Sequence, residues 1–171
     1  MKKISLKQRA KLFSIKKIFD VQDEVGNKIG FIKDKSIWRS SSFYQILDKN
    51  FSSKSKAVLS KTMVLVNENG DVLAEAKYCW PQTSAKTLEI IYKDQEIVVE
   101  NQLYETGKIK ILPKRQYTAK DKNGNILFAL SYIGLSSDSL IELAQDSDEA
   151  DFLALCVFTA DMINSFDLRM W

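Results

Sequence analysis

Residues 148–163 read Asp148-Glu149-Ala150-Asp151-Phe152-Leu153-Ala154-Leu155-Cys156-Val157-Phe158-Thr159-Ala160-Asp161-Met162-Ile163. The run has the length and composition of an α-helix, and its apolar residues point in every direction around the helix axis. A helix that is apolar all round has to be buried all round. Asp146 and Glu149 match the D-x-x-E form of a capping box, which predicts where the helix begins. Acids at this position also favour the positive end of the helix dipole.

The chain before this helix carries three copies of one turn motif between strand-like flanks. The motif is [Asp/Asn]-[Glu/Lys]-x-Gly-[Asn/Asp], and it occurs at Asp23–Asn27, Asn67–Asp71 and Asp121–Asn125. Asp or Asn opens the turn by bonding forward to the backbone, and Gly takes the left-handed position of a bulged hairpin. The glycines lie 44 and then 54 residues apart, so the motif marks recurring hairpins and not the fixed period of a solenoid.

Other short apolar segments complete a strand-rich chain. Besides the flanks of the three motifs, strands are expected at residues 37–39, 43–47, 88–92, 97–99, 103–104, 109–112 and 140–143, and Ser52–Lys56 is expected to be an exposed loop. Many short strands indicate a sandwich or a barrel, and the natural place for a helix apolar on all sides is the inside of a barrel. The expected fold is therefore mainly β, with a buried C-terminal helix, in one domain over residues 1–171. Residues 1–6 are a candidate flexible leader.

The amino-acid composition excludes several classes of catalytic and metal-binding site. The chain has no histidine, which removes Ser-His-Asp and Cys-His nucleophilic sites, histidine acid–base catalysis and histidine metal ligands. Its two cysteines, Cys79 and Cys156, form no metal-binding or redox motif, and the glycines form no phosphate-binding loop. No catalytic residue, metal site or cofactor is expected. The longest apolar run, Phe152–Phe158, is too short to span a membrane, and a cytoplasmic location is expected.

The N-terminal segment holds most of the excess positive charge. Seven basic residues and no acid precede Asp20, so residues 20–171 carry a net charge of −4 within a chain of net charge +3. One interpretation is a solvated leader followed by an edge strand that lysines protect from unwanted pairing. The other is a contact with an anionic surface. Six basic residues are candidates for that contact: Lys7, Arg9, Lys16, Lys17, Lys114 and Arg115.

In this combination the chain resembles the tubby C-terminal-like superfamily, especially its plant LURP-one-related and small bacterial members. The resemblance runs through residues 7–21 and Asp23–Asn27, resumes at residues 119–125, and ends with residues 139–143 and the helix that finishes Phe158-Thr159-Ala160-Asp161. It implies a closed antiparallel barrel of about twelve strands around the helix. Within the superfamily it also implies different functions: phosphoinositide binding in tubby proteins, action at membranes in phospholipid scramblases and defence in plants.

Three functions follow as hypotheses. The first is a non-catalytic module that recognises anionic phospholipid headgroups or a membrane surface through the six basic residues, at the inner face of the membrane. The second is a protein-interaction or scaffold domain without lipid binding. The third and least favoured is an enzyme that uses carboxylates, since nothing in the sequence brings two of its acids together. A net charge of +3 is too small to indicate nucleic-acid binding.

Overall fold

A computed structural model describes residues 2–9, 18–34, 41–57, 60–79, 86–102, 115–132 and 138–167. Within these ranges the chain forms one helix, α2 (Ala150–Asp167), and twelve strands. The strands are β1 (Lys3–Gln8), β2 (Ile18–Gln22), β3 (Lys28–Asp34), β4 (Ser41–Ile46), β5 (Lys49–Ser55), β6 (Thr62–Asn67), β7 (Val72–Tyr78), β8 (Lys86–Tyr92), β9 (Gln95–Asn101), β10 (Arg115–Asp121), β11 (Ile126–Tyr132) and β12 (Ser139–Leu143).

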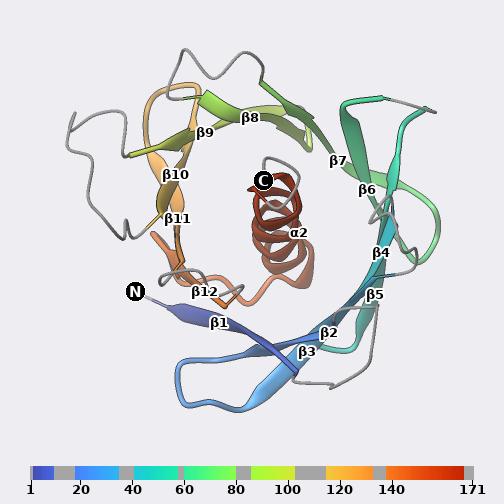
Figure 1. Cartoon of the computed structure of the whole chain (residues 1–171), viewed down its shortest axis with the longest axis vertical. Helices are drawn as coiled ribbons and strands as arrows, with labels where there is room; N and C mark the ends of the chain where they lie inside the picture. The colour runs from blue at the N-terminus through green and yellow to red at the C-terminus, as the bar shows by residue number, and fades with distance from the viewer. Residues whose placement is uncertain are drawn as a thin grey trace.

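The twelve strands of the described chain close into a single antiparallel barrel (Figure 1). Each strand pairs with its neighbours in the sequence, and β1 pairs with both β2 and β12, so the first and last strands join. Because neighbours in sequence are neighbours in space, successive connections alternate between the two ends of the barrel. The predicted closed antiparallel barrel is confirmed.

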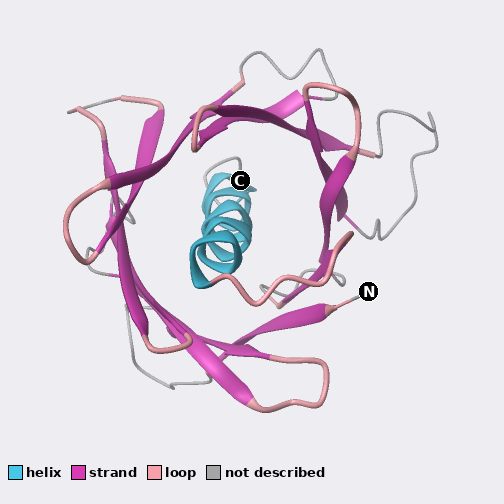
Figure 2. Ribbon diagram, turned by 180° about the vertical axis from the view of Figure 1, so that it is seen from behind, coloured by secondary structure: helices cyan, strands magenta, loops and turns pink. Residues whose placement is uncertain are grey.

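Helix α2 lies inside this barrel (Figure 2). Every residue from Leu153 to Asn164 is buried, and Leu153 to Phe158 are fully inaccessible to solvent. Inward-facing side chains from all twelve strands surround the helix in one core. The predicted burial of the helix on all sides is confirmed. In the described part of the chain, no helix has both the length and the apolar character that crossing a membrane requires.

Tyrosine hydroxyls from the barrel wall bond the second half of the helix. The Tyr132 hydroxyl donates to the Ala160 carbonyl at 2.8 Å, and the Tyr78 hydroxyl donates to the Met162 carbonyl at 2.8 Å. The Tyr44 hydroxyl donates to Asp161 Oδ2 at 2.7 Å. Burial and the nearby Asp161 charge raise the pKa of Tyr44, which keeps the phenol protonated as a donor. These bonds satisfy polar groups that the barrel interior removes from water.

The three sequence motifs form the bulged hairpins that were predicted. In the first, Asp23 Oδ1 accepts from the backbone N–H groups of Val25 and Asn27, and Gly26 has a φ of 94°. The same bonds and a left-handed glycine recur at Asn67–Asp71 and Asp121–Asn125. The strand register shifts by one residue next to each turn, as a bulge requires.

Five short turns gather at one end of the barrel, which we call the hairpin end. It comprises turns 23–27, 47–48, 67–71, 93–94 and 121–125, together with the start of β1 and the link from β12 to α2. Helix α2 therefore begins at the hairpin end and runs towards the opposite end, where odd-numbered strands finish and even-numbered strands begin.

Three expectations from the sequence are wrong. Residues 3–6 are no flexible leader, because they belong to β1, where Ile4 and Leu6 are buried. Strand β1 is also no edge strand, since it pairs on both sides. Ser52–Lys56 is no exposed loop: residues 49–55 form β5, with Phe51 and Ser53 facing the core.

The predicted capping box is also displaced. Helix α2 begins at Ala150, so Glu149 occupies the N-cap position, and its carbonyl accepts the first helical bond from Leu153 at 3.0 Å. Asp146 lies too far before the helix for its predicted role. The strands expected at residues 37–39, 103–104 and 109–112 lie outside the described residues.

Candidate anion-binding surface

Three strands that rise from the hairpin end carry a lysine at the same place. Lys33, Lys54 and Lys77 are each the sixth residue of a seven-residue strand, in β3, β5 and β7. At about 3.3 Å per residue, each lysine lies roughly 20 Å along the strand from its turn, near the opposite end of the barrel. All three are exposed and alternate with core-facing residues. We call these three residues the lysine row.

The strand register fixes the spacing of the lysine row. Lys33 lies opposite Phe43 of β4, whereas Lys54 lies opposite Ser41, two residues further along. Two strand spacings of about 4.8 Å and this two-residue stagger separate the two Cα atoms by about 12 Å. Lys54 and Lys77 have the same relation through Val64 and Thr62 of β6. The row is therefore regular and follows the curvature of the barrel.

The lysine row is the centre of a surface with uncompensated positive charge. Among the described residues, the three lysines form no ion pair, and neither do Lys7 at the end of β1 and Lys61 before β6. We call the end that carries these five lysines the basic end.

Three glutamates near the basic end are paired with lysines. Glu75 pairs with Lys56 at 2.7 Å, Glu89 pairs with Lys86 at 3.7 Å, and Glu100 pairs with Lys120 at 2.8 Å. The Asp138 carboxylate accepts from the Gln8 backbone N–H at 2.8 Å. These three glutamates therefore do not offset the charge of the five unpaired lysines.

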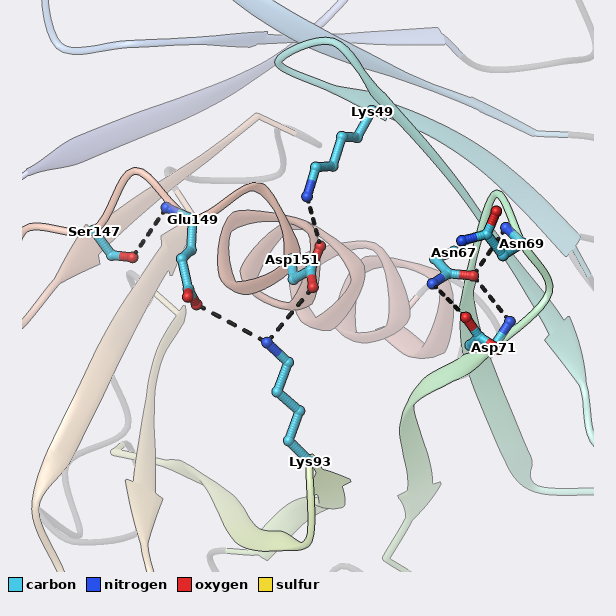
Figure 3. A network of polar contacts seen from close by, with 8 residues as sticks. All are labelled: Lys49, Asn67, Asn69, Asp71, Lys93, Ser147, Glu149 and Asp151. Atoms are coloured by element: carbon cyan, nitrogen blue, oxygen red, sulfur yellow. Dashed lines mark hydrogen bonds and ion pairs between the residues drawn. The ribbon is translucent and has the colours of Figure 1, made fainter.

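The hairpin end has the opposite pattern. Within the described chain, five acids there form no ion pair or side-chain hydrogen bond: Glu24, Asp48, Glu68, Asp94 and Glu96. Lysines at this end are instead used by the start of α2. Figure 3 shows Lys49 and Lys93 reaching Asp151, at 3.6 and 3.5 Å, with Lys93 also 4.0 Å from Glu149. The charges of the two ends complement the helix dipole, which is positive at the hairpin end.

Two of the six predicted contact residues have described side chains. Lys7 is exposed and unpaired at the basic end, as the hypothesis requires. Arg9 differs, because its Nε and Nη2 donate to the two oxygens of Asp20 at 2.7 and 2.6 Å. Lys28 also pairs with Asp20, at 3.0 Å. The hydrogen bond from Arg9, with a further one from Lys28, lowers the pKa of Asp20 to about 2. Arg9 is therefore already committed within the fold.

The other four predicted residues lie partly or wholly outside the described structure. Arg115 is the first residue of β10, which begins at the basic end, but its side chain is not described. Lys16, Lys17 and Lys114 lie outside the described residues. The structure therefore places Lys7 and the backbone of Arg115 at the same end of the barrel.

Sequence reasoning missed Lys33, Lys54, Lys61 and Lys77. The sequence does contain a signal for the lysine row, because each of its lysines lies six positions after the last residue of the preceding turn. The pairs are Asn27 and Lys33, Asp48 and Lys54, and Asp71 and Lys77. An even spacing keeps the side chain on one face of a strand. The turn at Leu47-Asp48 has no glycine, so the sequence did not mark the start of β5, and the common spacing was hidden.

The structure also bears on other kinds of site. A shallow groove of about 360 Å³ lies outside β6–β9, next to Lys77 of the lysine row, and Glu75 and Glu89 line it. Both carboxylates bond lysines, as described above, which leaves them poorly suited to act as a general acid or base. Among the described residues, no three histidine, cysteine, aspartate or glutamate side chains gather where they could hold a metal ion.

Comparisons with family models, curated proteins and solved structures find no match to this chain. The resemblance to the tubby C-terminal-like superfamily thus stays a prediction from the sequence. The geometry of the basic end carries the functional argument without it.

Proposed function

We propose that the protein is a non-catalytic binding module whose basic end contacts an anionic phospholipid surface. The observation that carries the proposal is the lysine row, which presents three unpaired ammonium groups at one end of the barrel, where Lys7 and Lys61 are also unpaired. Charge that the fold leaves uncompensated on one surface favours an anionic partner. The proposed location is the cytoplasmic face of the membrane.

The spacing of the row favours a surface over a single headgroup. A lysine bonds a phosphate oxygen at about 2.7–2.9 Å. Lysines whose Cα atoms are about 12 Å apart suit several anionic groups in one plane better than one phosphate. Each lysine near such a surface contributes about 1 kcal/mol, so the five lysines contribute about 5 kcal/mol, enough for weak, reversible binding with a submillimolar dissociation constant.

Vesicle sedimentation tests the proposal. The protein is mixed with phosphatidylcholine vesicles that contain or lack phosphatidylserine, and the bound fraction is measured as the salt concentration rises. We expect binding only to the anionic vesicles, and we expect added salt to weaken it because these charges are exposed. Equal binding to both kinds of vesicle, or no binding to either, would contradict the proposal.

The chain offers a matched control for the lysine row. A triple variant Lys33→Gln, Lys54→Gln and Lys77→Gln removes three charges at the basic end. A second triple variant, Lys3→Gln, Lys49→Gln and Lys122→Gln, removes three charges at the hairpin end. We expect the first variant to bind anionic vesicles about 100-fold more weakly and the second to change binding by less than about threefold. Equal losses would show that net charge matters and the row does not.

A further inference from the structure

Exposed apolar side chains gather at the end of the barrel that the proposed function does not use. Among the described residues, five large apolar side chains are exposed: Val25 (80%), Leu47 (39%), Val72 (56%), Ile91 (53%) and Ile126 (51%). Each belongs to a different one of the five short hairpins, in or within two residues of its turn. Single exposed apolar residues are common on protein surfaces. Within the described chain, each of the five short hairpins at this end therefore carries one such residue.

Leu47 adds an independent observation, because its backbone is strained. It has a φ of 51° in a two-residue turn, a left-handed conformation that glycine or asparagine adopts more easily. Its N–H donates to the Ile29 carbonyl at 2.7 Å, which holds the turn against β3. The fold thus keeps a leucine where another residue would relieve strain, and 39% of that leucine is exposed to water. Strain of this kind is typical of functional positions.

Unpaired acids lie beside these apolar residues. Glu24 precedes Val25, Asp48 follows Leu47, and Asp94 follows Ile91 by three positions. Glu68 lies in the turn just before Val72. These acids form no ion pair within the described chain, as shown above. The hairpin end therefore combines negative charge with apolar contact area.

We propose that the hairpin end is a docking surface for a basic segment of another protein that also carries apolar side chains. Charge complementarity selects a basic partner, and the five apolar residues select one with apolar side chains of its own. A second copy of this chain, whose basic end also carries positive charge, is the alternative occupant that the experiment below distinguishes.

The two ends of the barrel act independently in this account. Because they lie at opposite ends of the strands, a membrane at the basic end leaves the hairpin end accessible. The protein would then hold a partner at an anionic surface. The docking proposal does not depend on lipid binding and holds even if vesicles are not bound.

A synthetic peptide of alternating leucine and lysine is the probe for this surface. Its fluorescence anisotropy is measured against the full chain at physiological salt, beside a peptide of alternating serine and lysine. We expect the leucine–lysine peptide to bind at least tenfold more tightly, and its nuclear magnetic resonance shifts to fall on the five hairpins. Equal affinities, or shifts elsewhere on the barrel, would overturn the proposal.

Leu47→Gly separates docking from stability. Glycine relieves the left-handed strain, so we expect the variant to unfold at a higher temperature and yet to bind the leucine–lysine peptide about tenfold more weakly. Gln116→Ala, at an exposed position of β10 near the basic end, is the control and should bind as the wild type does. Unchanged peptide affinity in Leu47→Gly would contradict the proposal. Concentration-dependent association of the chain in sedimentation velocity, abolished by Leu47→Gly, would show that the occupant is a second copy instead.

Discussion

Gly30→Ala should strongly destabilise the barrel, because β3 and β4 approach each other closely at this residue. A Cβ atom on Gly30 would lie 2.0 Å from the Gln45 carbonyl oxygen and 3.0 Å from the Gln45 carbonyl carbon. Both are backbone atoms, so no side chain can rotate away. The strands would have to separate by about 1 Å before the closest contact reached a tolerable distance.

The loss in free energy of unfolding that we expect for Gly30→Ala follows from this separation of β3 and β4. Overpacking of this kind costs about 1–3 kcal/mol, and each weakened hydrogen bond between the strands adds about 1 kcal/mol. The bond from Leu47 to Ile29, at 2.7 Å, is one of those at risk. We therefore expect Gly30→Ala to lower the free energy of unfolding by about 3–5 kcal/mol. In a domain of this size the melting temperature would fall by about 10 °C.

Urea denaturation followed by circular dichroism measures this change, and Gly26→Ala is the matched control. Gly26 has a φ of 94°, but an added Cβ would meet nothing within 4 Å. In Gly26→Ala only the left-handed backbone conformation is unfavourable, so we expect the free energy of unfolding to fall by about 1–2 kcal/mol. If Gly30→Ala cost no more than Gly26→Ala, the register that brings β3 against β4 would be wrong.

Four further substitutions probe the interior, one exposed turn residue and one surface ion pair. Phe158→Ala should lower the free energy of unfolding by about 3–5 kcal/mol, because Phe158 is fully buried. Val25→Ala, at an exposed position, should change the free energy of unfolding by less than about 0.5 kcal/mol. Urea denaturation measures both. Tyr44→Phe should cost about 1–3 kcal/mol in the same assay, because the buried Asp161 carboxylate loses a donor. The pKa of Asp20 is lowered to about 2 in the folded state, so its contribution is complete above pH 5 and is lost as the pH falls towards 2. After allowance for solvent screening this contribution is about 1 kcal/mol, and the acid branch of the stability curve should be shallower in Asp20→Asn.

The interior helix and the three bulged hairpins could be predicted because local chemistry determines them. The run from Leu153 to Ile163 is too apolar to leave any face in water. The hairpin residues carry their own turn bonds: Asp23 and Asp121 each accept from backbone groups within the next four residues. In both cases the sequence signal lies within one short stretch of the chain.

Features that depend on distant partners could not be predicted. Polar residues of β5 such as Ser52 and Ser53 resemble a loop until β4 and β6 are known to lie on either side. Lys3 and Lys7 resemble a solvated leader until β12 closes the barrel against β1.

In the candidate site, too, local sequence predicts some residues and others depend on distant strands. Lys7 was identified by the local excess of positive charge. The lysine row depends on three strands that share a direction and a stagger, which becomes visible only in the register. The ion pair between Arg9 and Asp20, which engages one predicted contact residue, joins the residue after β1 to β2 and also depends on the fold.

Native-state hydrogen exchange tests the enclosure of α2 most directly. If strands surround the helix on every side, its amides from Leu153 to Ile163 can exchange only when the barrel opens. We expect their opening free energies to equal the global free energy of unfolding and to fall with urea in parallel with it. Helix amides that exchange at a lower free energy, while the amides of β1 and β12 stay protected, would show that α2 leaves an intact barrel and would contradict the enclosed fold.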